Sequence, residues 1–172
     1  MKKTTLIAFV AFASIGIASI QSCKENSDTT APEFIADNNS FSGNMSWSLA
    51  KTLNGPDPLL GAMAHANNDS SVVRKVYFKN GQNPVNSKYP IGTLIVKHSH
   101  NPNGTVNEFT AMAKRGNNFN PNSGDWEYFV LTPSGTIATD ASGMPLRGAN
   151  LMGGMCASCH SMASAKDYVF SK

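Results

Sequence analysis

The chain has 172 residues, of which 41% are apolar and 15% are charged. This length and balance predict a single domain and favour a globular, turn-rich protein over a disordered chain. The formal net charge is only +3, and the sequence contains no basic run or aromatic–basic stripe, so a nucleic-acid partner is not expected.

Residues 1–22 have the pattern of an export signal. Lys2 and Lys3 form a positive end, and the apolar run over 6–20 is too short to span a bilayer comfortably. Cys23 then follows in a lipobox-like context (IQSC), although Ile20 and Gln21 depart from the commonest residues. We expect Cys23 to be lipidated and to begin the mature chain; the alternative is an ordinary signal peptide cut nearby.

The mature protein is therefore expected outside the cytoplasm, held to a bacterial membrane, periplasmic or cell-surface, by its lipid anchor only. Residues 23–32 are polar and end in proline, which is typical of a short flexible tether. One domain is predicted over 33–172. Loss of the two leader lysines lowers the formal charge to about +1.

Two helices are predicted at the start of this domain. Apolar residues recur every four positions at Phe41, Met45, Leu49 and Leu53, and residues 54–56 (NGP) follow as a stop signal. Asp57-Pro58 is typical of an N-cap and first helical turn, which predicts a short second helix ending near His65.

Four β-strands are predicted next, over 72–79 (VVRKVYFK), 92–99 (GTLIVKHS), 108–114 (EFTAMAK) and 126–132 (WEYFVLT). Each is rich in β-branched or aromatic residues, and turn clusters rather than helices separate them. The pattern predicts an α+β fold, which is mainly an antiparallel sheet with a few short helices and carries haem c near the C-terminus.

The motif Cys156-Ala-Ser-Cys159-His160 is the attachment signal for c-type haem. Its two thiols add to the two porphyrin vinyl groups, and His160 is placed to become the axial ligand of the iron. A structural zinc site would need four ligands, and a thioredoxin-like site would need a βαβ pattern. The chain offers neither, and its three cysteines are accounted for by one lipid and one haem.

His160 lies 12 residues from the C-terminus, so no downstream residue can reach the opposite side of the iron. A sixth ligand would have to come from upstream, and the candidates are Met63, His65, His98, His100, Met112 and Met144. The other possibility is an open distal site that binds small molecules. His98 and His100 share one strand face, and a polar surface patch is the simpler interpretation of that pair.

Short segments spread over most of the domain resemble the cytochrome P460 family, which includes the β-sheet cytochromes c′. They are 55–56 (GP), 61–65 (GAMAH), 73–78 (VRKVYF), 92–97 (GTLIVK), 112–116 (MAKRG), 124–128 (GDWEY), the haem motif and 166–170 (KDYVF). Their order, ending in the haem motif and KDYVF, carries the resemblance.

The resemblance implies a mono-haem c protein, often a homodimer, whose iron binds small nitrogen ligands and whose redox partner is unknown. Catalytic members oxidise hydroxylamine and carry an extra bond between the haem and a lysine. The β-sheet cytochromes c′ lack that bond and bind nitric oxide. Lys97 matches the lysine position, and a solvated lysine at a strand end is the alternative interpretation.

Catalytic members also place an acidic residue over the distal face, and here the sequence departs from the family pattern. Thr110 and Ala111 stand near that position, and Glu108 is the nearest acid. Phe109, Thr110, Met112 and Glu108 are the candidates for the distal pocket. The function predicted is binding or redox conversion of hydroxylamine or nitric oxide; the alternatives are a non-catalytic nitric-oxide-binding cytochrome c′ and a plain electron carrier.

Overall fold

The computed structural model describes residues 31–61, 63 and 69–170. The predicted signal, Cys23, most of the tether and His65 lie outside the described residues. In the part that is described, no helix is long and apolar enough to cross a membrane.

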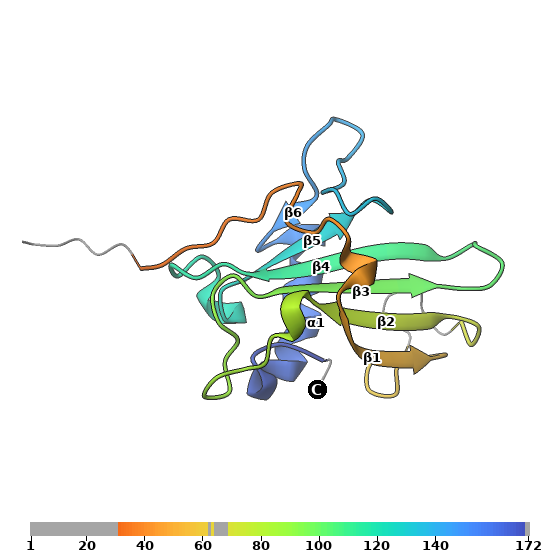
Figure 1. Ribbon diagram of the computed structural model, residues 1–172, viewed down its shortest axis with the longest axis horizontal. Helices are drawn as coiled ribbons and strands as arrows, with labels where there is room; N and C mark the ends of the chain where they lie inside the picture. The colour runs from red at the N-terminus through yellow and green to blue at the C-terminus, as the bar shows by residue number, and fades with distance from the viewer. Residues whose placement is uncertain (1–30, 62, 64–68, 171–172) are drawn as a thin grey trace, which may run out of the picture.

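A six-stranded antiparallel sheet forms the centre of the molecule, and its strands are ordered as they occur in the chain (Figure 1). The strands are β1 Ser48–Asn54, β2 Val73–Phe78, β3 Leu94–His100, β4 Asn107–Lys114, β5 Trp126–Leu131 and β6 Arg147–Gly148. Every neighbouring pair is antiparallel. The predicted mainly antiparallel α+β fold is confirmed.

Helical structure consists of short elements before, between and after the strands. It comprises η1 Asn44–Ser46, η2 Lys79–Gly81, η3 Pro121–Ser123, η4 Leu151–Gly154, α1 Met155–His160 and η5 Ser161–Lys166. The predicted short helix around the haem motif is confirmed as α1.

The predicted helix through Phe41 and Leu53 is wrong. The segment contains the single turn η1 and then the strand β1, in which Leu49 and Leu53 pair with β2. The four-residue spacing runs across two different elements, because Met45 lies in η1 and Leu49 and Leu53 lie in β1. Hydrogen bonding of this segment to the edge of the sheet therefore outweighs the helical pattern. The second predicted helix appears as a turn in which the Asp57 carboxylate accepts the N–H groups of Leu59 and Leu60.

Strand alternation divides the core into two clusters on opposite faces of the sheet. One cluster joins Phe41 of the N-terminal segment to Leu94, Val96 and Phe129. The other joins the C-terminal segment to the opposite side chains of the same strands and includes Phe78, Ile95, Met112, Tyr128, Leu151 and Val169. The N-terminal segment and the C-terminal helices thus cover different faces (Figure 1).

Candidate haem site

Helix α1 places the haem motif against the face that the C-terminal segment covers. Leu151 is buried in the cluster on this face, and Cys156 and Ala157 pack against the same cluster. Gly154, with φ of 84°, forms the N-cap of α1, a backbone conformation that glycine adopts without strain. Cys156 and Cys159, three residues apart in a helix, lie on neighbouring positions of one helix face.

The two motif cysteines are free and half-buried. Burial raises the pKa of both thiols, while the positive charge of Lys97 acts in the opposite direction on each. Two protonated thiols on one helix face are the groups that thioether formation with a porphyrin requires, so this part of the chain fits the predicted haem.

The His160 imidazole is held in one orientation. Its Nδ1 lies 2.7 Å from the carbonyl oxygen of Tyr168, and its ring contacts the rings of Tyr128 and Phe170 with centroid separations of 5.4 and 5.2 Å. A carbonyl oxygen can only accept, so Nδ1 carries the hydrogen and Nε2 keeps its lone pair.

Burial lowers the pKa of His160 to about 4, opposed by the hydrogen bond to Tyr168 and assisted by the charge of Lys97. A neutral imidazole with a free Nε2 and a carbonyl-bound Nδ1–H is the form that ligates iron. The His160 imidazole therefore has the protonation state and the orientation that an axial iron ligand requires.

Lys97 lies on the same face of the sheet as the haem motif. It alternates with Leu94 and Val96 of the opposite face and shares its own face with Ile95. Burial and then the charge of Arg74 lower its pKa to about 8, and the charges of Cys159, Asp57 and Glu108 oppose the shift. Roughly a tenth of this amine is therefore unprotonated, and nucleophilic, at pH 7, far more than for an ordinary lysine.

The register of the sheet places Lys97 in a half-buried row. Val76 and Thr110 are its partners on β2 and β4, and Val130 pairs with Thr110 from β5. All four side chains are half-buried. The next row, Phe78, Ile95, Met112 and Tyr128, is buried beneath the C-terminal segment. The first row thus forms a half-exposed surface beside α1, with a valine at each end and Lys97 and Thr110 between them.

The predicted distal residues divide between two faces. Thr110 lies in the row of Lys97, Met112 is only 7% exposed in the neighbouring row, and Glu108 is exposed on the same face of β4. Phe109, also predicted for the distal pocket, belongs instead to the cluster on the opposite face, so the structure does not bring it together with the haem motif. Alternation along β4 directs its ring away from α1.

Two of the histidine candidates for a sixth ligand, His98 and His100, lie on that opposite face as well. The ring of His98 stacks on Phe109 with centroids 4.1 Å apart and on His100 at 4.7 Å. An iron held by α1 is separated from both imidazoles by the sheet. Met144 is 63% exposed in the segment between β5 and β6.

Two contributions to the site were missed by sequence reasoning. Asp57, recognised only as an N-cap, raises the pKa of both Lys97 and Cys159 through its charge. The Tyr168 carbonyl orients His160 from a turn eight residues away. No signal in the sequence identifies either, since one depends on the loop after β1 and the other on a backbone oxygen.

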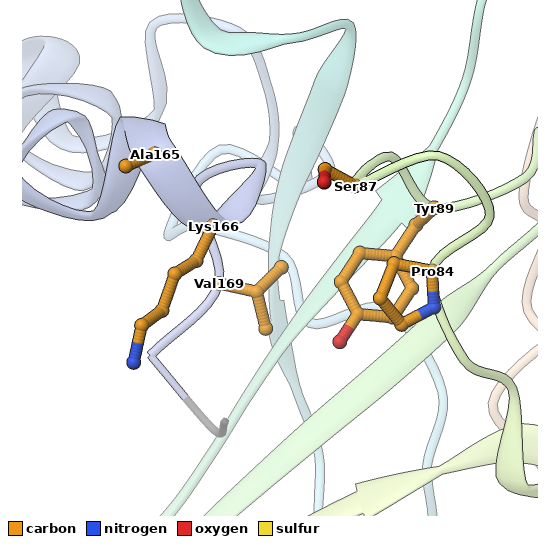
Figure 2. Close-up of a pocket in the computed structure, with 6 residues that line it drawn as sticks. All are labelled: Pro84, Ser87, Tyr89, Ala165, Lys166 and Val169. Carbon is orange, nitrogen blue, oxygen red and sulfur yellow. The ribbon is translucent and has the colours of Figure 1, made fainter.

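A zinc site is not supported by the described residues, among which no three His, Cys, Asp or Glu side chains converge on a point. Figure 2 shows a separate pocket lined by Pro84, Ser87, Tyr89, Ala165, Lys166 and Val169. It includes neither the motif cysteines nor Lys97, so it is distinct from the candidate haem site.

Comparison with known proteins gives one match. The family model described as Cytochrome P460 matches residues 60–171, which include β2 to β6 and the haem motif. Neither the curated proteins nor the solved structures contain a match. The match spans well over half of the chain and implies a haem cofactor, which the thiols, the oriented imidazole and the half-exposed surface beside them fit. The chain belongs to the cytochrome P460 family.

Proposed function

We propose that this protein is a lipid-anchored, extracytoplasmic mono-haem c cytochrome that binds and redox-transforms small nitrogen species at the distal side of its iron. The observation that carries the proposal is the meeting of four groups on one sheet face. The thiols of Cys156 and Cys159, the prepared imidazole of His160 and the amine of Lys97 interact electrostatically with one another there.

Cys156 and Cys159 would attach the porphyrin. In each addition, the sulfur forms a bond to one vinyl carbon and the thiol hydrogen goes to the other, so no external redox reagent is needed. His160 Nε2 would be the proximal ligand. The bound haem supplies one-electron redox chemistry and a coordination position for a small ligand.

The row containing Lys97 would form the wall beside the porphyrin. Val76 and Val130 exclude water from that wall, and the Thr110 hydroxyl is the polar group in the row that can hydrogen-bond a small ligand. Lys97 would lie at the porphyrin edge, where its partly unprotonated amine influences the electron density of the ring.

A covalent bond from Lys97 to the porphyrin would replace one N–H and one C–H by a C–N bond. The product lacks two hydrogens, so its formation requires a two-electron oxidant such as a peroxide. Proteolytic digestion of the holoprotein tests the bond directly. Recovery of the Lys97 peptide attached to haem and two hydrogens lighter supports it, and complete recovery of the unmodified peptide contradicts it.

A second candidate function, nitric-oxide binding without turnover, is favoured by the residue opposite Lys97. That position in β4 is Thr110, and the nearest acid on the strand, Glu108, is exposed in the next row. A hydroxyl group is a poor proton acceptor for hydroxylamine oxidation compared with a carboxylate.

Turnover assays with hydroxylamine and an artificial electron acceptor distinguish the two functions. Turnover by the wild-type protein supports the enzyme. Turnover that appears only in Thr110→Glu, with nitric oxide bound by both proteins, supports the non-catalytic function. Thr110→Gln, which has the same shape without the charge, is the matched control.

The membrane attachment rests on Cys23 and is tested separately. Expressed with its own leader, the protein is expected in the membrane fraction with a lipidated N-terminal cysteine. Cys23→Ser should prevent lipidation while leaving the haem spectrum unchanged. A wild-type protein with an unmodified N-terminus would contradict the anchor. A redox partner and a second copy of the chain remain predictions from the family resemblance.

A further inference from the structure

The C-terminal turn that supplies the acceptor for His160 has an unusual backbone. Asp167 and Tyr168 follow η5 with φ of 50° and 65°, so two consecutive residues other than glycine occupy the left-handed region. Such residues persist only where their surroundings over-determine the conformation, and a bulky residue such as tyrosine is rare there. The contacts of this turn should therefore reveal what holds it.

Asp167 is fixed by three different parts of the chain. Lys114 Nζ lies 2.8 and 2.7 Å from its two carboxylate oxygens, and both side chains are buried. The backbone N–H of Tyr89 donates to Oδ2 at 2.7 Å. Trp126 Nε1 donates to the Asp167 carbonyl, also at 2.7 Å. Strands β4 and β5 and the loop before β3 thus converge on one residue.

The residue held in this way directly precedes the carbonyl that orients His160. Tyr168 N–H donates to the carbonyl of Ala163, and the Tyr168 carbonyl accepts from His160 Nδ1. Further along, Lys51 Nζ lies 3.3 Å from the carbonyl of Phe170. The position of the Tyr168 oxygen is therefore set from both sides, and more strongly on the side of Asp167.

We propose that the buried Lys114–Asp167 ion pair is a positioning device for His160. It holds the Tyr168 carbonyl at hydrogen-bonding distance from Nδ1 and thereby sets the donor strength of Nε2 toward the iron. The inference rests on the proposed role of His160 as the proximal ligand. A stronger hydrogen bond at Nδ1 makes the imidazole a better donor, which strengthens its bond to iron and favours the oxidised state.

A merely structural role is the alternative, since a buried ion pair can also serve the packing of a tail. The two roles differ in what they change at the iron. We would record the resonance Raman histidine–iron stretch of the ferrous holoprotein and its reduction potential for the wild type and for Asp167→Asn. The variant should show a lower stretching frequency and a higher potential, because the Tyr168 carbonyl moves away from Nδ1.

Glu127→Gln is the matched control. Glu127 is a buried acid like Asp167 and pairs with the half-buried Arg147, but it points to the opposite face of the sheet. Its replacement should lower stability while leaving frequency and potential at the wild-type values. If Asp167→Asn fails to fold, Lys114→Gln supplies the same comparison, since it removes the charge and keeps a hydrogen-bond donor. Lys114→Arg, which retains the charge, should restore the frequency toward the wild-type value.

The possible results distinguish the positioning role of the Lys114–Asp167 pair from the proposed function as a haem protein. A wild-type histidine–iron band that is unchanged in both Asp167→Asn and Lys114→Gln overturns the positioning role and leaves the proposed function intact. Equal shifts in Glu127→Gln and Asp167→Asn also overturn it, because they would reflect general loosening. A wild-type protein without any histidine–iron band contradicts the proposed function and the inference together.

Discussion

The two faces of the sheet bury ionisable groups in opposite ways. On the face under the N-terminal segment, the buried acid Glu127 accepts from Arg147 Nε at 2.7 Å and from Arg115 at 3.4 Å. On the face under α1, Lys97 and His160 lose hydration, and no described acid stands at ion-pair distance from either.

The difference shows what each face is for. A buried charged group that is fully paired contributes to structure, and its ion pair keeps it ionised and unreactive. Lys97 and His160 instead become neutral more easily, and their nitrogen lone pairs are left available. We call the face under α1 the functional face and the face under the N-terminal segment the structural face. Lys114 and Asp167 are informative because they form a fully paired, buried ion pair, as on the structural face, but lie on the functional face.

The largest expected effect comes from removing the two haem-attachment cysteines on the functional face. Replacing both thiols, Cys156→Ser with Cys159→Ser, should abolish covalent haem retention completely, because hydroxyl groups do not form the thioether bonds. Haem staining after denaturing electrophoresis measures this. Haem that stays attached to the double variant would contradict attachment through the motif.

A large effect confined to stability is expected on the structural face. Glu127→Ala leaves the Arg147 and Arg115 guanidinium groups without their buried partner and should lower the free energy of unfolding by about 3 kcal/mol. Urea unfolding measures the loss, and the optical spectrum should remain that of the wild type. An altered haem spectrum would show that the two faces are not independent.

Acid should weaken the functional face through His160. Its folded pKa of about 4 lies below the ordinary 6.5, so the unfolded state binds more protons between these values. The free energy of unfolding should therefore fall by about 3 kcal/mol as the pH is lowered from 6.5 to 4.

Urea unfolding of the haem-free protein across this pH range checks the fall, because in the holoprotein the iron would occupy His160 Nε2 in place of the proton. The control is His100→Gln, because burial also lowers the pKa of His100 and gives it the same sign of pH dependence on the other face. The fall should persist in this variant. If stability is instead flat from pH 6.5 to 4, the neutral, buried state of His160 is wrong.

A smaller effect is expected where the sheet meets the C-terminal turn. Gly124 has φ of +59°, and a Cβ atom there would lie 2.9 Å from both Asp167 Oδ1 and the Tyr168 ring. Gly124→Ala should cost about 1–3 kcal/mol and shift the histidine–iron band in the direction of Asp167→Asn. If Gly124→Ala lowers stability but leaves the histidine–iron band at its wild-type frequency, the contact between Gly124 and the C-terminal turn contributes to packing only.

The smallest effect is expected from the face that does not meet the haem. Phe109→Leu keeps most of the apolar volume of a side chain that stacks on His98, and should cost less than about 1.5 kcal/mol. Nitric-oxide affinity should be unchanged. A clear change in affinity would return Phe109 to the distal pocket and undo the assignment of the two faces.

Sequence reasoning succeeded where a signal was local. The strands β2 to β5 were predicted from β-branched residues between turn clusters. The five consecutive residues CASCH are sufficient to indicate haem attachment. Sequence reasoning failed for β1, because the edge strand shares its apolar spacing with η1, and for the two-residue β6, which is too short to leave a pattern.

The candidate site shows the same limit. Alternation correctly grouped Lys97 with Ile95, but the pattern of one strand does not say which face meets the haem, so Phe109 and Met112 were proposed together although they lie on opposite faces. The contributions of Asp57 and the Tyr168 carbonyl depend on loops brought together by folding. Only the three-dimensional arrangement identifies them.

In the function that we propose, His160 is the single protein ligand of the iron, and the opposite side is open beside Lys97. Optical spectra of the purified ferrous protein, recorded before and after addition of nitric oxide, test it most directly. We expect a high-spin spectrum that nitric oxide converts to that of a nitrosyl complex. A low-spin, six-coordinate spectrum that nitric oxide leaves unchanged would contradict it.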